Sequence, residues 1–198
     1  MPRPEPTPPT GLAIFLVVAG AIGFAAAFAL TLDKIALLED PNAQLSCNFS
    51  VLIGCGTNLN SPQGALFGFP NPLLGLAGWS VVITIGAALL AGARFRTWFW
   101  VGLNIGALGA LALVLWLIQQ SIFVLDVLCP WCMVTWAVTI PVFLAVTLHN
   151  LRSGHIPVPA SVRRAANAAY GWTPLITLGC FIAIAAVAQL QMDVLNRL

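Results

Sequence analysis

Five uncharged apolar stretches, each about as long as a membrane-crossing helix, are the feature that most constrains how this chain folds. A bilayer-spanning α-helix needs about 20 consecutive apolar residues, and the stretches reach this length with charges only at their ends. Of the 198 residues, 60% are hydrophobic and only 7% are charged, which is too little polar surface for a soluble globule. The expected spans are Gly11 to Leu32, Pro72 to Ala93, Trp98 to Ile118, Val127 to Leu148 and about Trp172 to Met192. The sequence therefore predicts an all-α integral membrane protein.

The basic residues predict which way the spans run, because Lys and Arg collect on the cytoplasmic side of a membrane. With the N-terminus inside, only Lys34 and Arg197 fall on the outer side. The basic residues expected inside are Arg3, Arg94, Arg96, Arg152, Arg163 and Arg164. The C-terminus is then outside, and both the loop after the first span and the start of the fourth span open outward.

The segments between the spans differ in composition. Residues 1–10 contain five prolines, so we expect a disordered cytoplasmic tail. Residues 33–71 are polar and are expected to form the outer loop. Within this loop, Asn48 to Gly54 is apolar enough for a short, half-buried helix at the membrane interface. Residues 149–171 are expected to form a cytoplasmic loop, and residues 172–198 a fifth, peripheral membrane helix with an outer C-terminus.

A Cys-x-x-Cys motif, Cys129-Pro130-Trp131-Cys132, stands at the start of the fourth span. With Cys129 as N-cap and Pro130 at the first helical position, the motif begins a helix. The positive end of the helix dipole favours the thiolate, which is the nucleophilic form of cysteine. Zinc would need four ligands, and the only histidines, His149 and His155, lie a full helix away, so we expect no metal.

Four of the five cysteines are expected on one surface of the membrane. The predicted topology places Cys47 and Cys55 of the outer loop on the same side as Cys129 and Cys132. The fifth, Cys180, lies inside an apolar run and is expected to be a buried, inert thiol. Two dithiols facing a disulfide-permissive compartment, beside a membrane that carries lipid-soluble electron carriers, indicate thiol oxidation coupled to a quinone.

The same residues resemble the vitamin K epoxide reductase family, in particular its bacterial disulfide-forming members. The resemblance covers residues 32 to 147 and depends on four cysteines, a serine six residues after the second of them, and an Asn-Pro before the second span. The matching segments are Leu32-Asp33-Lys34, Cys47, Cys55, Ser61-Pro62-Gln63, Phe67-Gly68-Phe69-Pro70-Asn71-Pro72 and Cys129-Pro130-Trp131-Cys132.

The resemblance implies that residues 11–148 form a four-helix bundle around a quinone. It makes Cys129 and Cys132 the active pair, and Cys47 and Cys55 the shuttle pair in the outer loop. Cys55 would join transiently to Cys129, because thiol-disulfide exchange passes through a mixed disulfide. Cys132, one helical turn deeper, would be the thiolate next to the quinone ring.

Three further positions are candidate quinone-binding or supporting residues by the same resemblance. Ser61 is implied to support the outer site and Asn71 to hydrogen-bond a quinone carbonyl, which would stabilise the reduced form. From the residues alone, the favoured interpretations are structural: a helix cap or turn for Ser61 before Pro62, and a loop end for Asn71 before Pro72. Trp136 stands where the vertebrate enzymes have a tyrosine, which puts epoxide reduction in doubt. It is expected to line the pocket or to pack in the bundle.

The remaining motifs carry structural predictions only. Gly102, Gly106 and Gly109 along the third span are typical of close contact between helices. The other tryptophans are assigned to interfacial belts and packing.

Together these observations predict a membrane thiol:quinone oxidoreductase in a bacterial cytoplasmic membrane, with its active site facing outward. Its electron donor would be a separate thioredoxin-like protein, and its acceptor a menaquinone, ubiquinone or vitamin K type quinone. One alternative is an enzyme that recycles vitamin K quinone or epoxide. Another is a structural or transport protein in which a Cys47–Cys55 disulfide is a static staple, although no mid-membrane charge favours transport.

Overall fold

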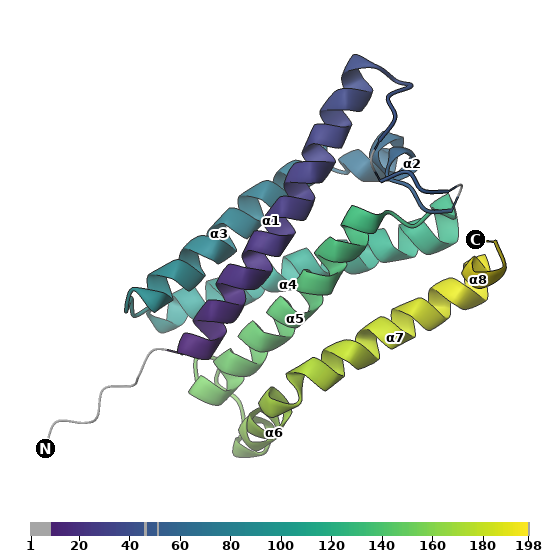
Figure 1. Cartoon of the computed structure of the whole chain (residues 1–198). Helices are drawn as coiled ribbons and strands as arrows, with labels where there is room; N and C mark the ends of the chain where they lie inside the picture. Colours follow the sequence, from purple (N-terminus) through teal and green to yellow (C-terminus); the bar gives the residue numbers. More distant parts are fainter. Residues whose placement is uncertain (1–8, 46, 51, 198) are drawn as a thin grey trace, which may run out of the picture.

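The computed structural model describes residues 9–45, 47–50 and 52–197, which form helices joined by short connections (Figure 1). Five helices are long and apolar enough to cross a membrane. They are α1 (Thr10–Glu39), α3 (Pro72–Leu90), α4 (Thr97–Gln120), α5 (Pro130–Ser153) and α7 (Thr173–Met192). The shorter elements are α2 (Gly56–Asn60), the 3₁₀ turn η1 (Pro62–Ala65), the π-helical turn η2 (Ser121–Leu125), α6 (Ala160–Gly171) and α8 (Val194–Arg197). The predicted fold class, an all-α membrane bundle, is confirmed.

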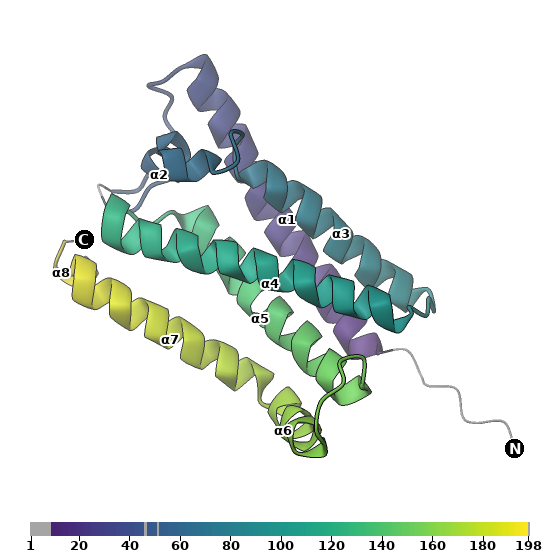
Figure 2. The ribbon, with the colours of Figure 1, turned by 180° about the vertical axis from the view of Figure 1, so that it is seen from behind.

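Helices α1, α3, α4 and α5 form the bundle, and α7 lies beside α5 at its edge (Figure 1 and Figure 2). Helix α1 packs against α3 and α5, and α4 packs against α5. A Cβ atom on Gly86 of α3 would lie 2.8 Å from a methyl of Val17, so the missing side chain lets the backbones of α1 and α3 approach closely. The core between these helices is apolar and includes the buried side chains of Leu16, Trp79 and Val146.

Helices α3 and α4, in contrast, do not pack along their length, and a cavity of about 760 Å³ lies between them and α5. The predicted glycine contact on α4 is therefore wrong. A Cβ atom at Gly102, Gly106 or Gly109 would meet nothing within 4 Å, and all three residues line the cavity. The glycines add no side-chain bulk to the face of α4 that lines the cavity, which helps to keep this space open.

The two ends of the bundle differ in their chemistry. One end, called here the cysteine end, carries the two predicted cysteine pairs together with the C-terminus (Figure 1). The other, called the arginine end, carries the connections between α3 and α4 and between α5 and α7. The described basic residues on these connections and the adjoining helix ends are Arg94, Arg96, Arg152, Arg163 and Arg164. Arg3, which the sequence also assigns to this side, lies outside the described residues.

Helix α1 is longer than the sequence predicts at both ends. It begins at Thr10, so the predicted tail is wrong at that residue, and the rest of the tail up to Pro8 lies outside the described residues. It also continues past Leu32 to Glu39, so the outer loop starts only at Asp40. Residues 33–39 contain no glycine or proline to end a helix. The stop comes from Pro41, which disfavours helical geometry in the residue before it and leaves Asp40 extended.

The predicted interfacial helix from Asn48 to Gly54 is wrong for the residues that the structure describes, which exclude Val51. The segment is a tight irregular loop in which the N–H groups of residues 49 and 50 both donate to the carbonyl of Ile53. The side-chain oxygen of Asn48 accepts from the N–H of Cys55 at 2.9 Å and of Gly56 at 3.3 Å. Asparagine competes with helical hydrogen bonding in this way, and the short helix forms instead just after Cys55.

The predicted cytoplasmic loop at residues 149–171 is also largely helical. Helix α5 runs on to Ser153 and ends at Gly154, whose φ of 76° is a left-handed helix cap that favours glycine. Residues 160–171 form α6, an alanine-rich segment with high helix propensity. Only the few residues between Gly154 and Ala160 connect the two helices.

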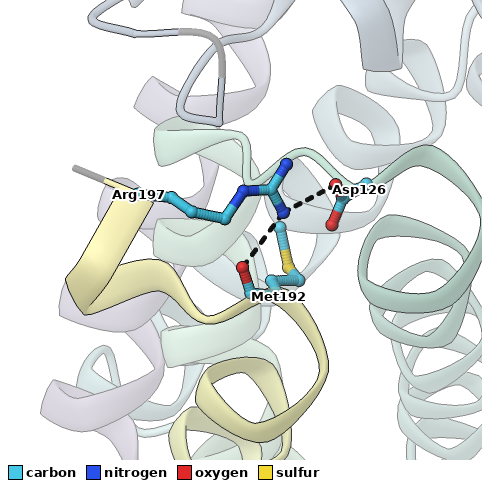
Figure 3. A network of polar contacts seen from close by, with 3 residues as sticks. All are labelled: Asp126, Met192 and Arg197. Carbon is cyan, nitrogen blue, oxygen red and sulfur yellow. Dashed lines mark hydrogen bonds and ion pairs between the residues drawn. The ribbon is translucent and has the colours of Figure 1, made fainter.

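The C-terminal segment, through Met192 and Arg197, attaches the cysteine end of α7 to the turn before α5. Arg197 forms an ion pair with Asp126, with a separation of 2.9 Å, and also donates to the carbonyl of Met192 at 3.1 Å (Figure 3). The Met192 side chain is 1% exposed and packs with Leu128 and Trp136. Although α7 stands at the edge of the bundle, its last turn therefore packs next to the Cys-x-x-Cys motif.

We expect the packing of Met192, rather than the ion pair, to attach α7. Both charged partners of Arg197–Asp126 are about half exposed, and exposed ion pairs contribute only about 0–1 kcal/mol. Replacing a buried methionine by alanine costs about 2–5 kcal/mol. Met192→Ala should therefore lower the free energy of unfolding in detergent clearly more than Arg197→Ala, and equal losses in the two variants would contradict this assignment.

Candidate active site

The active pair begins helix α5 in the way that the sequence predicts. Cys129 is the N-cap residue, with extended backbone angles, and Pro130 follows as the first helical residue. The N–H of Cys132 donates to the sulfur of Cys129 at 3.3 Å. Hydrogen bonding from the Cys132 side chain, assisted by backbone N–H groups, lowers the pKa of Cys129 against the opposing effect of burial. The lowered pKa favours the thiolate form of Cys129, the first cysteine of the motif.

The shuttle cysteines form a disulfide that lies against this thiol. Cys47 and Cys55 are bonded to each other, whereas Cys129 and Cys132 are free. The sulfur of Cys55 is 3.4 Å from that of Cys129. Both of these cysteines are fully buried. A thiolate at van der Waals distance from a disulfide sulfur is placed for exchange, which starts by attack on that sulfur.

Backbone pairing between distant segments produces this approach. Ile53 and Leu128 form a short parallel bridge. The N–H of Leu128 donates to the carbonyl of Leu52 at 2.8 Å, and the carbonyl of Leu128 accepts from the N–H of Gly54 at 3.0 Å. Leu128 and Gly54 are the residues directly before Cys129 and Cys55. The pairing therefore sets the two reactive sulfurs side by side, and the sequence analysis missed it.

The second cysteine of the motif, Cys132, lines the cavity between α3, α4 and α5. The cavity walls are mainly apolar and extend along α4 from Gln120 to Trp98, which is nearly the length of the helix. Polar side chains collect at its cysteine end. They are Asn58, Ser61, Gln63, Asn71, Gln120 and Ser121. Cys129 thus faces the loop disulfide while Cys132 faces an apolar space large enough for a small-molecule ligand.

Ser61 lies at the polar end of the cavity and acts as a helix cap. Its hydroxyl donates to the carbonyl of Asn58 at 2.8 Å and accepts from the N–H of Gly64 at 3.2 Å, at the start of η1. The cap interpretation is therefore confirmed. A supporting role toward a bound quinone stays a prediction.

Asn71 also lines the cavity, and its side chain closes the loop before α3. The amide nitrogen donates to the carbonyl of Gln63 at 2.7 Å, and the amide oxygen accepts from the N–H of Leu66 at 3.1 Å. An amide nitrogen carries two hydrogens, so one of them is available to a ligand. The structural role is evident, and the hydrogen bond to a quinone stays a prediction.

Trp136 lies one turn further along α5 than Cys132. It is buried, lines the cavity and packs with Leu128 and Met192. The packing role is therefore confirmed, whereas stacking on a ligand stays a prediction. Of the other tryptophans, Trp79 and Trp100 are buried, and Trp98 and Trp172 are more than 60% exposed, as expected for packing and belt positions.

Two side chains of the site were missed by the sequence analysis, although both stand in the segments that resemble the family. Gln63 places its side-chain oxygen in the buried wall of the cavity, where no described residue donates to it. Asp33 lies 3.2 Å from the sulfur of Cys47. The sequence analysis assigned Asp33 to the outer loop rather than to α1, so its position in the chain did not indicate a contact with Cys47.

The residues that could hold a metal do not form a metal site in this state. Asp33, Cys47 and Cys55 bring their potential ligand atoms within 4.8 Å of one another. The two sulfurs are bonded to each other, however, and metal ligation requires thiolates. The histidines lie at the arginine end, where both pack against Trp100.

The structure is that of a multi-pass membrane protein of the thiol-disulfide redox class. It combines bilayer-length helices with a buried loop disulfide, a dithiol at a helix N-terminus in contact with that disulfide, and an apolar cavity beside the dithiol. Residues 14–147 match the model of the vitamin K epoxide reductase family. This match covers more than half of the chain, and the protein belongs to that family. Members of the family are generally membrane oxidoreductases that act on thiols and quinone-type substrates. A search of curated proteins found no match to the chain.

We expect the Asn48 side chain to determine how closely Cys55 approaches Cys129. Asn48→Ala removes the acceptor for two N–H groups and should cost about 1–3 kcal/mol locally. In a Cys47→Ser/Cys132→Ala background, mild oxidation should then produce the Cys55–Cys129 cross-link several-fold more slowly than without the Asn48 change. Asn48→Asp keeps an acceptor oxygen at the same place and should retain the rate. Equal rates in all three proteins would contradict the assignment.

Proposed function

We propose that the protein is a membrane thiol:quinone oxidoreductase that reoxidises a separate thioredoxin-like protein. Electrons enter at the shuttle pair Cys47/Cys55, pass to the active pair Cys129/Cys132 and leave to a quinone. The observation that carries the proposal is the position of the active pair, with Cys129 3.4 Å from the sulfur of Cys55 and Cys132 in the cavity wall.

The exchange between the pairs balances without any further reagent. When the shuttle pair is reduced and the active pair oxidised, the thiolate of Cys55 attacks the sulfur of Cys129, and Cys132 leaves as a thiolate beside the cavity. Cys47 then attacks Cys55, and Cys129 is released. The shuttle pair is oxidised and the active pair reduced at the end of this sequence. This is the state of the four sulfurs in the structure.

The thioredoxin-like partner needs the outer loop to open. Cys47 is 2% exposed and Cys55 is not exposed at all, because both pack among leucine side chains of α1, α2 and the loop. Attack by another protein requires direct access to one sulfur. We therefore assign the exchange within the chain to the closed loop, and the exchange with the partner to an open one.

The cavity fits a quinone in size, polarity and position. Ligand sites of about 300–1,000 Å³ are typical for small molecules and cofactors, and this apolar cavity of about 760 Å³ has its polar groups gathered near Cys132. The unpartnered oxygen of Gln63 offers an acceptor at that end for a hydroxyl of the reduced quinol, since the carbonyls of the oxidised quinone cannot donate to it. A quinone accepts two electrons and two protons, while the chain supplies the dithiol, the apolar walls and the polar groups near the ring. The open side between α3 and α4 suits an isoprenoid chain of the menaquinone, ubiquinone or vitamin K type.

The membrane orientation follows from the two ends of the bundle. The arginine end is assigned to the cytoplasm by the positive-inside rule, so the cysteine end faces outward. In a bacterial cytoplasmic membrane, this places the dithiols in the compartment where disulfides form. No observation favours epoxide recycling over quinone reduction, and a static staple would not need Cys129 in contact with the loop disulfide.

Cys132→Ala tests the electron path. The variant leaves Cys129 without its partner, so it should abolish reduction of a short-chain naphthoquinone by a reduced thioredoxin-like protein and accumulate a Cys55–Cys129 bridge. Cys180→Ser, which changes a thiol of α7 outside the cavity lining, should keep wild-type turnover. Recovery of Cys132→Ala with only the Cys47–Cys55 bridge would count against the relay, as would a wild type that reduces no quinone.

Filling the cavity tests the acceptor site. A Cβ atom at Gly106 would meet no other atoms within 4 Å, and Gly106 lines the cavity, so Gly106→Leu should raise the KM for the naphthoquinone at least tenfold without unfolding the protein. Gly179→Leu is the matched control, because Gly179 is equally open but lies on α7 outside the cavity lining. An unchanged KM in Gly106→Leu would place the acceptor elsewhere.

A further inference from the structure

Asp33, near the cysteine end of α1, lies directly against the shuttle disulfide. Its carboxyl oxygen is 3.2 Å from the sulfur of Cys47, and it is half-buried beside a sulfur that is 2% exposed. The relay described above moves sulfur bonds and electrons but leaves open where the proton of Cys47 goes. Cys47 lies in an apolar cluster with little contact to water. Among the described residues, the Asp33 carboxyl group is the polar side-chain group that contacts its sulfur.

The Asp33 carboxyl group contacts Cys47, and the other charged and titratable groups around it are exposed or bonded elsewhere. The neighbouring Lys34 turns toward α2, where its ammonium donates to the carbonyl of Leu59 at 2.9 Å and to the side chain of Asn60 at 3.2 Å. Glu39, at the end of α1, and Asp40, the residue after it, are exposed. From α5, the nearest titratable groups are the thiols of the active pair. Hydrogen bonding from Cys132 lowers the pKa of Cys129, and the negative charge of Asp33 opposes this weakly.

Thiol-disulfide exchange requires a proton acceptor at this position. Only the thiolate attacks a disulfide, so Cys47 must lose its proton before it attacks the Cys55–Cys129 bridge. A general base must lie within hydrogen-bonding reach of the proton it takes, and the Asp33 oxygen satisfies this condition for the shuttle thiol. Neither sulfur of the finished disulfide carries hydrogen, so the carboxyl group is then the partner that can hold the proton.

We propose that Asp33 takes the thiol proton of Cys47 as Cys47 attacks Cys55, and returns it when Cys47 next leaves as a thiolate. In the first step the Cys47–Cys55 bond forms, the Cys55–Cys129 bond breaks, Cys129 departs as a thiolate and the Asp33 carboxylate becomes a carboxylic acid. No oxidant is consumed, because one disulfide replaces another. This assignment depends on the proposed relay and adds its proton acceptor.

A carboxylate that acted only as a nearby negative charge would have the opposite effect. A like charge disfavours ionisation of a thiol, so its removal would increase the thiolate fraction of Cys47 and speed the exchange. General-base catalysis typically contributes a factor of about 10²–10⁴, so its removal slows the exchange instead. The sign of the change in Asp33→Asn therefore distinguishes the two roles.

The test uses the full chain with all four redox cysteines, dithiothreitol as thiol donor and a short-chain naphthoquinone as acceptor. Asp33→Asn should lower turnover at pH 7 at least tenfold, with the KM for the quinone unchanged and a rate that rises with pH. Samples quenched in acid during turnover, alkylated and mapped by mass spectrometry should show the Cys55–Cys129 bridge accumulating. Asp33→Glu should restore much of the rate, and Glu39→Gln, a change at an exposed acid of the same helix, should match the wild type.

Each result decides the assignment. Asp33→Asn protein that turns over as fast as the wild type or faster overturns it, as does slower turnover without accumulation of the bridge. A folded Asp33→Glu protein that accumulates no less bridge than Asp33→Asn also overturns it, and this holds even if the asparagine variant folds poorly. Wild-type protein that reduces no quinone overturns the proposed function itself. An active wild type with an unaffected Asp33→Asn variant removes only the role of Asp33.

Discussion

Two backbone hydrogen bonds, both made by Leu128, are the interaction on which the site depends. They join the turn before α5 to the loop that carries the shuttle disulfide, and they fix the residues immediately before Cys55 and Cys129. Without them, the two sulfurs would belong to segments more than 70 residues apart in sequence with no reason to meet. The packing of α7 against Leu128 and the hydrogen bonds that the Asn48 side chain accepts from Cys55 and Gly56 both support this junction.

The start of α5 separates two kinds of chemistry across one helical turn. Cys129 faces a buried disulfide, with which we propose that it exchanges, and Cys132 faces an apolar cavity, to which we assign the acceptor. The helix N-terminus and the hydrogen bonds from Cys132 favour the thiolate of Cys129. In the proposed function, this arrangement lets the pair connect exchange with the loop disulfide to a quinone in the cavity.

The unpacked boundary between α3 and α4 and the buried shuttle disulfide belong to the same functional arrangement. Helices α1 and α3 pack closely against each other, whereas the glycines of α4 add no side-chain bulk to the cavity wall and help to keep the cavity open. Burial of Cys47 and Cys55 protects the disulfide from other thiols until the loop opens. Asp33, within α1 and six residues before its end, provides a polar group in contact with the buried sulfur of Cys47.

The sequence by itself determined the number of membrane helices, the helix start at Cys129 and the family, because apolar length, capping chemistry and motif spacing are local properties of the chain. Local properties misplaced the end of α1 and the helix near Asn48, since a proline and a single side-chain amide decided those boundaries. Only the tertiary structure decided that Cys55 meets Cys129, that Asp33 meets Cys47 and that the glycines of α4 line a cavity. These outcomes depend on pairing and packing between segments far apart in the chain, which spacing along a sequence does not encode.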